Sequence, residues 1–133
     1  LLNPGTDVTI IATGHLVWEA LKAGEELERE GIYAEVINIH TIKPLDEDII
    51  LKSIEKTGCL VSAEEHNYVG GMGESIAGLL ALKNPCPIEF VATQDTFGES
   101  GTPAQLMSKY GLDKKAIMSK VASVLKRKLL LNT

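Results

Sequence analysis

The residues best suited to chemistry lie in one short segment in the middle of the chain. Two carboxylates and an imidazole, Glu64, Glu65 and His66, are followed by a glycine-rich turn at residues 70–73. A carboxylate beside an imidazole orients the ring and raises its proton affinity, as acid and base catalysis requires. Glycines ahead of a helix can present free amides to a phosphate. The segment therefore offers two chemistries, proton transfer and anion binding.

Both chemistries have structural alternatives in the same residues. The carboxylates adjoin no nucleophile, and a metal site would need a third ligand, for which His15 is the obvious choice. The glycine turn lacks the third glycine of the dinucleotide fingerprint, and Glu74 at the helix start would repel a phosphate. We favour a hydrogen-bonding cluster between domains, with a metal site and an anion site as the alternatives.

The glycines also have a purely structural interpretation. They allow a tight turn, and Gly73, Ala77 and Ala81 continue one face of small residues at helical spacing. We therefore expect a neighbouring backbone to approach this helix closely at Gly73.

Alternating strand and helix patterns must position this segment. Strands are predicted at residues 7–12, 34–39, 59–62 and 87–92. The first predicted helix ends at Gly31, the second is opened by Asp46, and the third covers 75–82. After the fourth strand come a short helix at 103–110 and a last helix, which Asp113 caps and the basic residues 126–128 close.

Four alternations without a repeat or linker predict an α/β domain of three layers, α/β/α, over residues 1–133. The sheet should be mostly parallel. Alternation does not fix the order of the strands, and we expect the common order 2-1-3-4. In that order residues 13–15 would face residues 64–66 across a crevice at the carboxyl ends of strands one and three, where such folds bind ligands.

Composition excludes several classes of function. The formal net charge of −5 argues against nucleic-acid binding, and the 44% hydrophobic content includes no run of membrane length. Cys59 and Cys86 both lie beside apolar runs and are interpreted as buried, reduced thiols. Without the pattern of a signal peptide, the expected location is the cytoplasm.

Four segments together resemble the C-terminal domain of transketolase in order and spacing. They are residues 5–14, residues 41–46, residues 64–66 with the turn at 70–74, and residues 97–101 with Leu106. The runs 43–46 and 65–66 look closer to transketolase than to deoxyxylulose-phosphate synthase or a 2-oxoacid dehydrogenase beta subunit, which share this domain. The resemblance covers nearly the whole chain.

This resemblance implies a part of a thiamine diphosphate enzyme that moves a two-carbon ketol unit between sugar phosphates, in the pentose phosphate pathway. In the family, N-terminal and middle domains hold thiamine diphosphate and a divalent metal, Mg or Ca, and the enzyme is a homodimer. The resemblance therefore implies that this domain contributes no catalytic, cofactor-binding or metal-binding residue and is inactive alone. It also implies an antiparallel edge strand before Val8, of which residues 1–6 would be a remnant, or else a linker.

The implied role is to pack against the other domains and the dimer partner. The candidate contact residues are His15, Glu64, His66, Gly71 and Gly73. The alternatives are the equivalent domain of deoxyxylulose-phosphate synthase or of a 2-oxoacid dehydrogenase beta subunit, and a free-standing module that binds a small anion.

Overall fold

A parallel sheet of four strands forms the centre of the molecule. The structure, a computed structural model, describes residues 2–39, 45–67, 71–93 and 113–131, with the backbone alone at 65–67 and 92–93. The strands, in chain order, are β1(Val8–Ala12), β2(Ala34–Asn38), β3(Leu60–Asn67) and β4(Ile88–Thr93). They lie in the order β2-β1-β3-β4, and all three pairings are parallel, so the predicted topology is confirmed.

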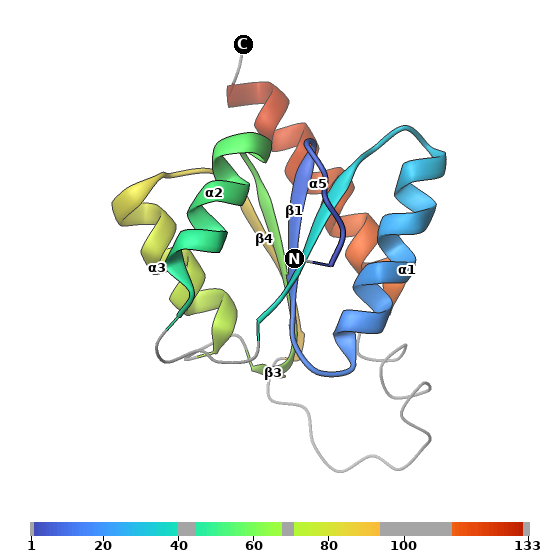
Figure 1. Ribbon diagram of the computed structural model, residues 1–133, viewed down its shortest axis with the longest axis horizontal. Coiled ribbons are helices and arrows are strands. Elements are labelled where there is room, and N and C mark those ends of the chain that lie inside the picture. Colours follow the sequence, from blue (N-terminus) through green and yellow to red (C-terminus); the bar gives the residue numbers. More distant parts are fainter. Residues whose placement is uncertain (1, 40–44, 68–70, 94–112, 132–133) are drawn as a thin grey trace.

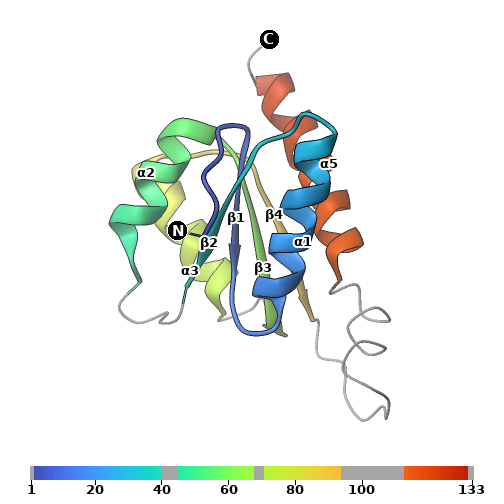
Figure 2. The ribbon, with the colours of Figure 1, turned by 45° about the vertical axis from the view of Figure 1, so that its right-hand side comes forward.

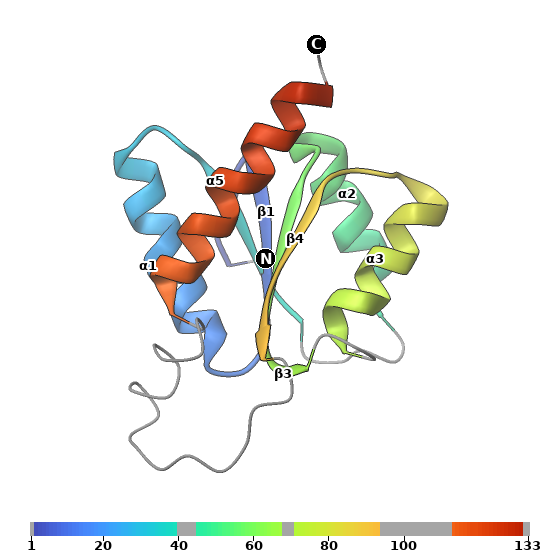
Figure 3. The same ribbon diagram turned by 180° about the vertical axis from the view of Figure 1, so that it is seen from behind.

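Helices cover both faces of this sheet (Figure 1). On one face lie α1(Leu16–Arg29) and α5(Lys114–Leu131), which are side by side when the molecule is turned (Figure 2). On the other face lie α2(Glu47–Thr57) and α3(Met72–Lys83) (Figure 3). Each face has its own cluster of buried apolar side chains, one around Ile10 and one around Ile11. The three-layer α/β/α prediction is confirmed.

Local sequence explains where these elements begin and end. Every residue of β1 is buried, as expected for a central parallel strand covered on both faces. Asp46 caps α2 by accepting from the Ile49 amide at 3.4 Å, and Gly58 ends that helix in the left-handed region at φ 72°. The carboxylate of Asp113 accepts from the Ala116 amide at 3.0 Å and so caps α5 as predicted.

Several boundaries differ from the prediction. Residues 64–66 were expected in a loop, but β3 continues through Asn67, because pairing with β4 resumes there after a register shift. Helix α3 begins at Met72 instead of Ser75. Helix α5 continues past the basic residues 126–128 to Leu131. Strand β4 begins one residue after Pro87, whose carbonyl accepts from the Leu60 amide.

The predicted helix at 103–110, the segment at 97–101 and the run at 41–44 lie outside the described residues. Within the described part of the chain, none of the helices has the length and apolarity needed to cross a membrane.

The residues before β1 are fastened to the outer edge of β2. Asn3 forms an isolated antiparallel bridge with Val36, whose amide donates to the Asn3 carbonyl at 2.8 Å. Gly5 lies so close to β2 that a Cβ atom there would be 2.3 Å from the Ala34 carbonyl carbon. That residues 1–133 form one domain, with residues 1–6 as the remnant of a linker or edge strand, stays a prediction.

A buried polar network connects the amino-terminal segment and β2 to α2. Glu35, only 2% exposed, accepts from the Gly5 amide at 3.2 Å and is ion-paired with Lys56. Burial alone would raise the pKa of Glu35, but hydrogen bonds from Lys56, Ser53 and the Gly5 amide outweigh it and lower that pKa. Ser53 in turn shares a 2.6 Å hydrogen bond with Thr9 of β1. The carboxylate therefore links β2, α2 and the amino-terminal segment.

Replacing this carboxylate should give a pH-dependent loss of stability. We expect Glu35→Gln to lower the free energy of unfolding at pH 7 by about 1 to 3 kcal/mol, because three donors lose a charged acceptor. Since the folded pKa lies below the ordinary value of 4.5, this contribution is complete above that value. It is lost as the pH falls through the folded pKa. Urea unfolding at neutral and acid pH measures both effects.

The matched control is Glu55→Gln, an exposed carboxylate on α2. It should change the free energy of unfolding by no more than about 0.5 kcal/mol at either pH. A Glu35→Gln deficit that is the same at acid and neutral pH would contradict the assignment of the network to an ionised Glu35.

Candidate functional site

The carboxyl ends of β1 and β3 lie side by side and carry the residues singled out in the sequence. Ala12 and Ala63 are paired across the two strands, and the Thr13 amide donates to the Ala63 carbonyl at 3.2 Å. The chain then turns from β1 into α1 at Gly14 and His15, both exposed. The two strand ends are therefore neighbours, as the predicted strand order requires.

Glu64 points from β3 to the amino end of α3. Its side chain is buried, with 1% of the residue exposed. Its two carboxylate oxygens accept separately from the amides of Met72, at 2.8 Å, and Gly73, at 2.9 Å. The N-cap residue, Gly71, has no side chain that could satisfy these donors. Glu64 therefore caps α3 from a neighbouring strand and places its negative charge at the positive end of the helix.

Gly73 lets α3 approach the sheet closely. A Cβ atom at this position would lie 2.6 Å from Ser62 Oγ and 2.7 Å from Phe90 Cδ1. Both distances are shorter than real Cβ contacts allow, so the sheet does approach α3 closely at Gly73. The contact is made by side chains of β3 and β4, and not by a neighbouring backbone as predicted. It does not extend along the helix as the small-residue face suggested, because Ala77 is only half-buried and Ala81 is exposed.

The structure does not bring His15 and Glu64 together. His15 is exposed and precedes α1, which covers one face of the sheet. Glu64 points to the other face, where it meets α3. The side chains of Glu65 and His66 lie outside the described residues, so the predicted placement of Glu64 and His66 on one face stays a prediction.

Among the described residues we find no evident site for a metal ion or an anion and no reactive thiol. They contain no group of three His, Cys, Asp or Glu side chains placed to hold a metal. The amides at the amino end of α3 that could bind an anion already donate to Glu64. Burial raises the pKa of Cys59 to about 11 and also raises the pKa of Cys86, so both thiols are protonated at neutral pH.

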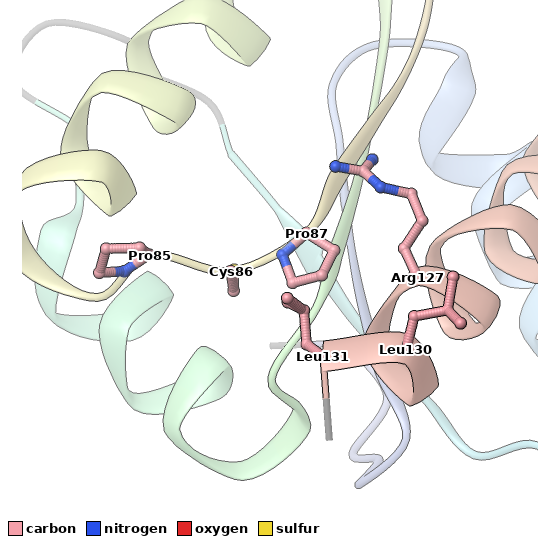
Figure 4. Close-up of a pocket in the computed structure, with 6 residues that line it drawn as sticks. All are labelled: Pro85, Cys86, Pro87, Arg127, Leu130 and Leu131. Atoms are coloured by element: carbon pink, nitrogen blue, oxygen red, sulfur yellow. The ribbon is translucent and has the colours of Figure 1, made fainter. Parts of the chain in front are cut away.

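A cavity lies elsewhere, between the residues that precede β4 and the last turn of α5 (Figure 4). It has a volume of about 590 Å³ and is lined by Pro85, Cys86, Pro87, Arg127, Leu130 and Leu131. Arg127 is ion-paired with Glu89, and the rest of the lining is apolar apart from the protonated thiol. Sequence reasoning missed this groove because it ended α5 before the leucines. The groove has no group suited to acid or base catalysis.

Comparison with known proteins identifies close relatives. The family model "Transketolase, C-terminal domain" matches residues 1–117. A 6-deoxy-6-sulfo-D-fructose transketolase subunit from Clostridium sp. (strain MSTE9) is 47% identical over 128 residues, which are 96% of this chain and 40% of the relative. The solved structure of a split-gene transketolase, an inactive β4 tetramer, superposes with a TM-score of 0.92 at 41% identity. That match covers 96% of this chain and 42% of the other.

Relatives with a different named activity also match. The 1-deoxy-D-xylulose-5-phosphate synthase of Heliobacterium modesticaldum is 40% identical over 113 residues, covering 84% of this chain and 18% of that enzyme. The chain thus spans less than half the length of each of these relatives. Similarity therefore extends across enzymes that act on different substrates, and the chain corresponds to one section of each.

A first prediction tests the close approach of α3. We expect Gly73→Ala to lower the free energy of unfolding by about 1 to 3 kcal/mol, because the new methyl group overpacks against Ser62 and Phe90. Gly78→Ala, on the same helix, should instead raise it by about 0.5 to 1 kcal/mol, because nothing lies within 4 Å of its Cβ position. Urea unfolding of both variants measures whether each change lowers or raises the free energy of unfolding. Equal effects would refute the close packing at Gly73.

A second prediction tests the cap that Glu64 provides. Glu64→Gln keeps the shape of the side chain but turns an NH2 group toward one of the two amides. We expect it to cost about 1 to 3 kcal/mol and to speed hydrogen exchange at Met72 and Gly73. Amide exchange measured by NMR is the readout. Glu47→Gln, in the exposed first turn of α2, is the control and should leave both amides unchanged.

Proposed function

The chain belongs to the transketolase C-terminal domain family, and from that premise we propose that it is the assembly section of a transketolase. The complete enzyme would transfer a two-carbon ketol unit between sugar phosphates with thiamine diphosphate and a divalent metal, Mg or Ca. This section would hold the other sections in their working arrangement without binding the cofactor. Small displacements of reacting groups cost much of an enzyme's rate, so such support affects catalysis directly.

The main observation in support of this proposal is that the Glu64 carboxylate caps the amino end of α3. A cofactor diphosphate needs free amide donors or a metal, and at this edge the donors of Met72 and Gly73 are already bound to Glu64. The described residues also offer no three-ligand metal group. The occupied amides count against a free-standing anion-binding module and support a role for this edge in contacts with protein.

Some of the described residues at the carboxyl edge of the sheet are exposed. His15 and Gly14 are exposed there, and Gly71 lies half-buried at the start of α3. We propose that these residues and His66 contact the amino-terminal and middle sections of the enzyme, or its dimer partner. Glu64 and Gly73 are buried and would act behind this surface by fixing the position of α3 beneath it.

Reconstitution tests this function. The chain alone should show no ketol transfer and no micromolar binding of thiamine diphosphate with Mg²⁺ by calorimetry. Mixed with the amino-terminal and middle sections of the enzyme, or expressed together with them, it should form a complex that transfers ketol units. Cofactor turnover by the chain alone, or full activity of the other sections without it, would refute the proposal.

The choice of donor separates transketolase from the related enzymes. A ketose phosphate should serve as donor to the complex, whereas a deoxyxylulose-phosphate synthase or a 2-oxoacid dehydrogenase would require a 2-oxoacid such as pyruvate. Calorimetry of the chain with inorganic phosphate and with a sugar phosphate tests the anion module. Micromolar binding of either anion would favour that module over an assembly role.

A further inference from the structure

The single tryptophan of the chain lies on the surface. Trp18 is in the first turn of α1 and is 71% exposed. It lines a groove of about 210 Å³ between α1 and the segment fastened to β2, together with Asn3, Leu21, Lys22, Glu25 and Glu28. A large exposed aromatic side chain beside a groove is the kind of residue that anchors protein interfaces.

The packing of α1 explains why Trp18 faces outward. The buried face of the helix, including Leu16 and Ala20, contacts the sheet. The flank toward α5 is already engaged, because Glu19 accepts from the Lys114 amide and Glu26 is ion-paired with the Lys114 side chain. Trp18 lines the groove on the flank toward Asn3, which α5 does not cover (Figure 2).

This groove continues the surface proposed above for partner binding. Helix α1 starts where β1 ends, so Trp18 follows the exposed His15 by three residues, close to one turn of helix. His15 and Trp18 therefore lie about one helical turn apart, and both are exposed. A protein that contacts His15 could reach Trp18 without a second binding site.

The charges of the groove indicate the chemistry of the partner. Glu25 and Glu28 on its rim are exposed, and the ammonium of Lys22 is already 2.5 Å from Glu19. The rim is therefore acidic. It complements a surface that offers an apolar pocket for the indole and basic side chains around that pocket.

We propose that Trp18 anchors the amino-terminal section of the enzyme described above, since this chain covers only 40% of the length of a relative 47% identical to it. This inference rests on the proposed function. The occupant is a folded section with an apolar pocket rimmed by Lys or Arg, carried on the same chain or on a separate one. Trp18 fills the pocket, and Glu25 and Glu28 face its basic rim.

Binding measurements on variants test the anchor. With the amino-terminal section produced separately, Trp18→Ala should weaken assembly at least about tenfold, measured as Kd by calorimetry. Trp18→Phe should retain part of the affinity. The matched control is Leu82→Ala on α3, which removes a side chain of even greater exposure, 85%, from the opposite layer. It should change Kd less than about twofold, and all three variants should keep the thermal stability of the wild type.

A spectroscopic readout reports on Trp18 alone. Because the chain has one tryptophan, labelling it with 5-fluorotryptophan gives a single ¹⁹F resonance, which the partner's own tryptophans cannot obscure. That resonance should shift and broaden when the amino-terminal section is added. Raising the salt concentration should weaken the complex, and Glu25→Gln with Glu28→Gln should reduce that salt dependence.

The outcomes distinguish this inference from the proposed function. If the wild-type chain assembles and restores activity but Trp18→Ala binds equally well, the anchor is wrong and the assembly role stands. If the wild-type chain does not assemble, both fail. If Trp18→Ala instead abolishes self-association of the chain alone, observed by sedimentation, the surface binds a second copy and the proposed occupant is wrong.

Discussion

The arrangement of the carboxyl edge depends on one interaction, the pair of hydrogen bonds from the amino end of α3 to Glu64. A helix start without a capping side chain would leave amide donors unsatisfied beside a sheet that packs tightly against Gly73. Placing the carboxylate on β3 satisfies these donors and ties the strand end to the helix. It also removes the most obvious anion site of the fold. The same contact thus stabilises the edge and occupies two of its amide donors.

A second carboxylate has a comparable role at the outer strand. Glu35 joins the Gly5 amide, Ser53 and Lys56, and so connects three segments that are far apart in the sequence. Together with the bridge between Asn3 and Val36, it holds the amino-terminal residues against β2. The amino-terminal residues are therefore held to the sheet by several hydrogen bonds.

Sequence reasoning predicted the layers and the topology because apolar periodicity and turn residues are local signals. It placed Glu64 in a loop because two adjacent glutamates and a histidine are polar. In the structure Glu64 is buried, and its carboxylate accepts hydrogen bonds from backbone amides at the start of α3, including that of Gly73, nine residues away. Such a partnership depends on tertiary contacts that periodicity does not encode. Trp18 was not singled out, because periodicity marks only the buried face of α1, and the placement of α5 is needed to show which flank stays open.

Two surfaces within the described part of the chain differ in what they can recognise. The groove near Pro87 is apolar, with its one arginine already paired to Glu89. The flank of α1 combines an exposed indole with acidic side chains and adjoins the exposed His15. Apolar contact alone contributes affinity but does not fix the orientation of a partner. An aromatic anchor beside charges of one sign also selects the partner and its orientation. The flank of α1 therefore offers more to selective recognition than the groove near Pro87 does.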